Sequence, residues 1–186
     1  MRLENFVTID FEASCLPRHG RSFPIEVATA GPEGVTSWLV KPVAGHDGWS
    51  WTHEAAALHG IDQDRLAREG LPAHRVFAEI NAVIAGRQLI ADSRIDQYWW
   101  SLLAGAAGED VGAPILYVGT ILDKIDLPSE DIFAAQHHAD ALHPTRHRAA
   151  DDALWLWTLL CRLKDMAVAD AALPAPPRQV PPSIAA

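Results

Sequence analysis

Cysteine is scarce in this chain of 186 residues, which contains only Cys15 and Cys161. The two are far apart and form no Cys-x-x-Cys pair, so neither a disulfide framework nor a cysteine-based zinc site is expected. We therefore expect a reducing, cytoplasmic setting. Long apolar runs are lacking too. Residues 1–5 lead into the first strand without an apolar leader, and no window reaches the roughly 18 apolar residues of a membrane span, so we expect no membrane partner.

Positive charge is also in short supply, because 15 lysines and arginines stand against 24 acidic residues, a formal charge of −9. This balance argues against a protein that coats long nucleic acids with a broad basic surface. It still allows an enzyme that holds a short strand end through metal ions and a few local bases. One such local group is Arg18, His19 and Arg21 in the loop 13–24, which is either a plain surface connection or a contact for phosphate groups.

The composition predicts one domain followed by a tail. Hydrophobic residues make up 49% of the chain, which is enough for an ordinary core, and we assign residues 1–170 to this domain. From Leu173 onward the composition shifts to proline, alanine and valine. Residues 171–186 are therefore predicted to form a Pro/Ala-rich disordered tail.

Alternation of apolar segments and turn residues indicates the fold class. Helices are predicted from Thr52 to Gly60, where the two residues act as caps, from Pro72 to about residue 85, and over about 92–103, 128–141 and 148–169. Five segments have strand character, residues 7–12, 25–30, 35–40, 88–91 and 114–118, and 31–34 reads as a hairpin turn. This order predicts an α/β fold with a mixed five-stranded sheet flanked by helices, antiparallel at one edge and parallel elsewhere.

Two acids end the first predicted strand. Side chains alternate along a strand, so Asp10 and Glu12 share one face with Thr8, whereas the apolar residues between them point the other way. Two neighbouring carboxylates in the middle of a fold repel each other unless they are protonated or bind a cation. Mg²⁺ and Mn²⁺ prefer carboxylate oxygen, so the strand indicates a divalent metal site.

Further acids and a histidine can complete such a site. Asp96 lies near the start of a predicted helix and Asp152 lies in the last helix, with His147 five positions before it. A histidine at the mouth of that helix can reach the metal site and take a proton from water. Asp92 competes with Asp96, and Asp151 competes with Asp152. Carboxylates that hold two divalent ions beside a general base are suited to phosphodiester hydrolysis.

These residues resemble the DEDDh 3′→5′ exonucleases. The resemblance rests on Ile9-Asp10-Phe11-Glu12, His59-Gly60-Ile61, Asp96 after a short strand, and His147-x4-Asp152, and it covers about residues 6–163. The middle motif departs from the family pattern, in which an Asn-Ala-x-Phe-Asp-like run is common. This chain has Ala91-Asp92-Ser93-Arg94-Ile95-Asp96 instead, which keeps Asp92 as a competitor for the middle position.

The resemblance implies an RNase H-like fold and a set of roles. Asp10, Glu12, Asp96 and Asp152 would bind two divalent ions, Mg²⁺ or Mn²⁺, and His147 would be the general base. Ala13 and Ser14 would lie near the terminal nucleotide of the substrate. The implied activity is hydrolysis of single-stranded DNA or RNA from 3′ ends to nucleoside 5′-monophosphates. Alternatives are a non-catalytic nucleic-acid-binding module on the same fold and a hydrolase of small phosphoesters.

The tryptophans leave one further question open. The chain has seven of them, and Trp99 and Trp100 lie in an apolar helical segment. They are interpreted as core residues, but the same helices could supply the interface of a homodimer.

Overall fold

The computed structural model describes residues 2–42, 49–110 and 113–171. The predicted tail falls outside these ranges, apart from Ala171, which is the last residue of the final helix. Within the described ranges, no helix is both long and apolar enough to cross a membrane.

A mixed five-stranded sheet forms the centre of the fold, with strand order β3-β2-β1-β4-β5. Strands β1 (Phe6–Ala13), β2 (Pro24–Gly31) and β3 (Gly34–Leu39) pair antiparallel. Strands β4 (Gln88–Ala91) and β5 (Ile115–Tyr117) continue the sheet parallel to β1. The predicted sheet, with one antiparallel and one parallel half, is confirmed.

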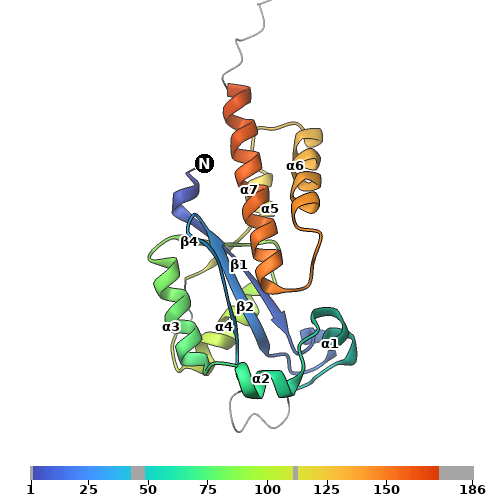
Figure 1. Cartoon of the computed structure of the whole chain (residues 1–186). Helices are drawn as coiled ribbons and strands as arrows, with labels where there is room; N and C mark the ends of the chain where they lie inside the picture. Colours follow the sequence, from blue (N-terminus) through green and yellow to red (C-terminus); the bar gives the residue numbers. More distant parts are fainter. Residues whose placement is uncertain (1, 43–48, 111–112, 172–186) are drawn as a thin grey trace, which may run out of the picture.

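Helices cover both faces of the sheet (Figure 1). Helices α3 (Ala73–Ile84) and α4 (Asp96–Ala107) pack on the face to which Val7, Ile9 and Phe11 of β1 point. Helices α6 (Ser129–Leu142) and α7 (Ala149–Ala171) pack against each other on the opposite face. Thr8 belongs to that second face, because its hydroxyl donates to the backbone oxygen of Ala153 in α7 over 2.7 Å. Strand alternation therefore directs Asp10 and Glu12 toward α7.

The shorter elements follow from local signals to different degrees. Helix α1 (His53–His59) begins and ends as predicted, with the Thr52 hydroxyl accepting from the amide of Ala55 and Gly60 in the left-handed conformation. Helices α2 (Gln63–Glu69) and α5 (Gly119–Leu122) were not predicted. They are too short to show a helical periodicity, and α2 buries one residue, Leu66. Two 3-10 turns, η1 (Leu3–Asn5) and η2 (Pro17–His19), flank β1.

Helix α4 runs further than the sequence indicated. The sequence predicted a helix that ends at about residue 103, but α4 continues to Ala107 and ends where Gly108 takes the left-handed conformation. Trp99 and Trp100 of this helix are 6% and 0% exposed, which confirms their interpretation as core residues.

Candidate active site

Small residues bring α7 close to the sheet and so position its acid. Ala149 and Ala153 of α7 pack on Ala28 and Ala30 of β2, and all four are almost fully buried. Alanine side chains let the helix backbone approach the strands, which is why Thr8 can reach the α7 backbone. Asp152, the neighbour of Ala153, is thereby held beside β1. One carboxylate oxygen each from Asp10, Glu12 and Asp152 lies within 4.8 Å of the other two.

A second group of acids forms where β4 ends. The parallel register pairs Thr8 with Ile90, so two residues further on Asp10 comes beside Asp92. Asp96 is the first residue of α4, which starts one short turn later. Oxygens of Asp10, Asp92 and Asp96 lie within 4.8 Å of one another. The sequence posed Asp92 and Asp96 as competitors, whereas the fold brings both to Asp10.

Burial and mutual repulsion change the protonation of these acids. Burial, followed by repulsion from Asp96 and Asp152, raises the pKa of Asp10 well above its ordinary value. The pKa of Glu12 is raised to about 8, mainly by burial and by Asp152, and that of Asp96 to about 8, mainly by burial and by Asp92. Carboxylates in this state favour either a proton or a cation.

One orphaned oxygen tests whether a metal suits the site. Asp96 is 1% exposed, and its Oδ2 has no hydrogen-bond partner among the described residues. A buried, unpaired carboxylate oxygen is costly unless a ligand satisfies it. Together with the all-oxygen donor set, this fits a hard divalent cation such as Mg²⁺ or Mn²⁺.

His147 lies two residues before α7 and is exposed. Its backbone is left-handed, with φ 67°, and its amide donates to Oδ2 of Asp152 over 2.7 Å. The backbone therefore holds the acid, and the imidazole remains at the rim of the cleft. The acids and His147 line one open cavity of about 270 Å³, the acidic cavity. Its walls are Asp10, Phe11, Glu12, Asp92, Ser93, Ile95, Asp96, Trp99, Arg146, His147 and Asp152.

A second, more apolar cavity of about 380 Å³ shares Glu12 and Trp99 with the first. Ala13 lines it, as do Arg18 and His19 of the basic loop. Ser14 does not line it.

The hydroxyl of Ser14 instead accepts from the amide of Phe23 over 3.0 Å, and the side chain is 2% exposed. Ser14 lines a different cavity, beside Trp49 and Trp51. Of the two residues expected near the terminal nucleotide, the fold therefore brings Ala13 to the cavity beside the acids and turns Ser14 away.

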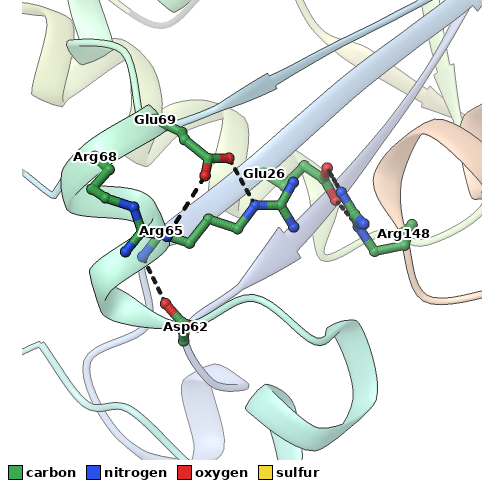
Figure 2. Close-up of polar contacts among 6 residues, drawn as sticks. All are labelled: Glu26, Asp62, Arg65, Arg68, Glu69 and Arg148. Carbon is green, nitrogen blue, oxygen red and sulfur yellow. Dashed lines mark hydrogen bonds and ion pairs between the residues drawn. The ribbon is translucent and has the colours of Figure 1, made fainter.

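Sequence reasoning missed two charged residues that organise the site. Glu26 of β2 is 1% exposed, and its carboxylate accepts from Nη2 and Nε of Arg148 over 2.6 and 3.0 Å. It also accepts from the amide of Ala149 over 3.1 Å, which ties the first turn of α7 to the sheet. Figure 2 shows this pair of Glu26 and Arg148, the clamp, and also draws the ion pair of Arg65 with Glu69 on α2.

The second missed residue is Arg146, which pairs with Asp152 and, at 3.8 Å, with Asp92. The sequence signal for it was the basic run at residues 143–148, which names no partner. Likewise, an isolated glutamate inside β2 gives no indication of an arginine 122 positions away.

No protein-family model and no curated protein matches the sequence. Solved structures do. A full-length 3′-exonuclease superimposes with a TM-score of 0.66 at 16% identity, over 90% of this chain and 62% of that one. A 3′-exonuclease from a structure of 3′-end recognition of histone mRNA stem-loop gives 0.63 at 17%, over 88% and 65%.

Exonuclease I from E. coli, in complex with a dA16 oligonucleotide, gives a TM-score of 0.67 at 14% identity, over 89% of this chain and 41% of that one. The chain thus spans less than two thirds of the length of each of these three proteins. These structures give no support to a homodimer, which stays a prediction. At such identities the likeness establishes the architecture, and the chain has the α/β fold of the 3′-exonucleases and exonuclease I.

Proposed function

We propose that the chain is a metal-dependent 3′→5′ exonuclease of the DEDDh type, which releases nucleoside 5′-monophosphates from single-stranded DNA or RNA. The observation that carries the proposal is the position of Asp10, which belongs to both groups of acids. A carboxylate shared by two oxygen-rich groups is suited to bridging two divalent ions.

The acids divide naturally between the two ions. Glu12 and Asp152 would hold one ion with Asp10, and Asp96, with Asp92 beside it, would hold the other. When bound there, two such ions would supply activation of a water and stabilisation of the leaving 3′ oxygen. His147 would accept the proton of that water, because its exposed imidazole lines the same cavity. Its backbone amide at the same time keeps Asp152 oriented.

The cavity next to Glu12 would receive the terminal nucleotide. Its walls include the apolar residues Ala13, Leu16, Leu58 and Trp99, which suit a base, and Arg18 lies among them. The net negative charge agrees with a substrate that is held at its end and not along a duplex. Ser14 would contribute indirectly, by fixing the backbone that follows Ala13.

The test is a time course on single-stranded DNA and RNA oligomers labelled at either end, with Mg²⁺, with Mn²⁺ and with EDTA. We expect stepwise shortening from the 3′ end that EDTA abolishes. Asp10→Ala should remove it, whereas Asp64→Asn, which changes an exposed acid of α2, should not.

Two results would contradict the proposal. Binding of oligomers without digestion under either metal would favour a non-catalytic nucleic-acid-binding module. Hydrolysis that needs neither a chain nor a free 3′ end would favour a hydrolase of small phosphoesters.

A further inference from the structure

Both oxygens of Asp152 are already occupied by the chain itself. Oδ2 accepts from the amide of His147 over 2.7 Å, and Oδ1 accepts from Nε of Arg146. Nη2 of the same guanidinium lies 3.8 Å from Oδ2 of Asp92. One arginine therefore contacts an acid of each group, Asp152 of the first and Asp92 of the second.

The guanidinium of Arg146 stacks on the ring of Trp155. Its central carbon lies 4.5 Å from the ring centroid of Trp155, a cation–π distance. Trp155 is 9% exposed, and its indole N–H donates to Oδ1 of Asp140 over 2.8 Å, so the ring is fixed between α6 and α7. Arg146 itself keeps about a third of its side chain exposed, at 35%. The ring is therefore enclosed by the fold, whereas the arginine stacked on it is partly exposed.

The ion pair between Arg146 and Asp152 depends on whether a metal ion is bound. Among the described residues that line the acidic cavity, Arg146 is the one lysine or arginine, facing five acids. A divalent ion held by Asp10, Glu12 and Asp152 needs an oxygen of Asp152. That ion repels a guanidinium on the same carboxylate, so the two cations compete. The forked donors of a guanidinium released from Asp152 are suited to phosphate groups.

We propose that Arg146 is a displaceable internal cation and a phosphate contact. It neutralises Asp152 and Asp92 while no metal is bound, leaves Asp152 when an ion binds, and then contacts a phosphate of the strand in the cleft. This inference rests on the proposed function, because it needs both the metal and a nucleic-acid substrate. It predicts opposite effects of one substitution on two ligands, which a merely structural arginine would not produce.

The variant is Arg146→Gln, and its matched control is Arg94→Gln. Arg94 is an exposed arginine between Asp92 and Asp96, and its guanidinium carbon lies 4.4 Å from the centroid of the Tyr117 ring. It is not among the residues that line the acidic cavity. The two measurements are Mn²⁺ affinity by calorimetry without nucleic acid, and affinity for an oligomer with non-hydrolysable 3′-terminal phosphorothioates in Mn²⁺. Thermal melting verifies that each variant is folded, and Arg146→Lys replaces the glutamine variant if it is not.

We expect Arg146→Gln to bind Mn²⁺ several-fold more tightly than the wild-type protein. We expect it to bind the oligomer about tenfold more weakly, the size of one lost charge-assisted hydrogen bond. Arg146→Lys should fall between the wild-type and glutamine proteins in both, and Arg94→Gln should match the wild type.

Any other pattern overturns the inference. Weaker binding of both ligands would mean that Arg146 only supports Asp152. Tighter Mn²⁺ binding with unchanged oligomer affinity would remove the phosphate contact, and no change in either would remove both roles. A wild-type protein that binds no Mn²⁺ would instead contradict the metal site of the proposed function itself.

Discussion

Glu26 lies directly opposite Glu12 across the antiparallel pair of β2 and β1. The two glutamates face the same helix, but only Glu26 is paired with a cation there. The Glu26 carboxylate accepts hydrogen bonds from Arg148 and from the amide of Ala149. The pKa of Glu12, in contrast, is raised to about 8, mainly by burial. The fold thus uses one acid of the pair to fasten α7 and leaves the other for the cleft.

Glu26→Gln tests the fastening role. The substitution removes the charge that Arg148 pairs with, so we expect the free energy of unfolding to fall by about 2 kcal/mol. This is less than for a fully buried pair, because the Arg148 side chain is 34% exposed. Denaturant unfolding measures the change. The matched control is Glu69→Gln, which breaks the exposed pair with Arg65 seen in Figure 2 and should cost about 0.5 kcal/mol or less. Equal losses in the two variants would contradict the clamp.

His147→Ala tests the general base. Because the amide and not the ring of His147 holds Asp152, we expect metal affinity to remain within about twofold of the wild type. Turnover should fall by about 10²–10⁴-fold, the usual contribution of a general base. Single-turnover digestion and Mn²⁺ calorimetry measure the two quantities. His137→Ala, on the exposed side of α6, is the control. Unchanged turnover would remove His147 from this role.

The pH dependence of stability without metal tests the protonated acids. Glu12 has a pKa of about 8 in the folded chain and near 4.5 when it is ordinary, so between these values the folded state binds more protons than the unfolded state. Stability therefore falls as the pH rises through this window. Glu12→Gln removes the effect. We expect its melting temperature in EDTA, relative to wild type, to be higher by a few degrees at pH about 8.5 than at pH about 5.5. A constant difference would contradict the raised pKa.

Metal binding should release protons from the same acids. At neutral pH Glu12 and Asp96 hold protons, since the pKa of each is about 8, and a divalent ion binds the deprotonated carboxylates. Calorimetry of Mn²⁺ binding in two buffers of different ionisation enthalpy counts the protons. We expect release near neutral pH and tighter binding as the pH rises toward about 8. Binding of Mn²⁺ near neutral pH without proton release would contradict this protonation state.

The sequence alone determined those features that depend on neighbouring residues. Alternation along residues 7–12 predicted that Asp10 and Glu12 share a face, and the hairpin at 31–34 and the caps at Thr52 and Gly60 were predicted because each signal acts within a few residues. The mixed sheet followed from the order of these elements. The resemblance carried by four short motifs selected the acids that the structure brings together.

The tertiary structure decided what depends on docking of distant segments. The register of β4 against β1 brings Asp92, in addition to Asp96, close to Asp10. The packing of Ala149 and Ala153 on β2 determines how close α7 comes to the sheet. Only that approach pairs Glu26 with Arg148, 122 positions away. Ion pairs of this kind leave no local pattern, because their partners are chosen by the packing of whole elements and not by spacing along the chain.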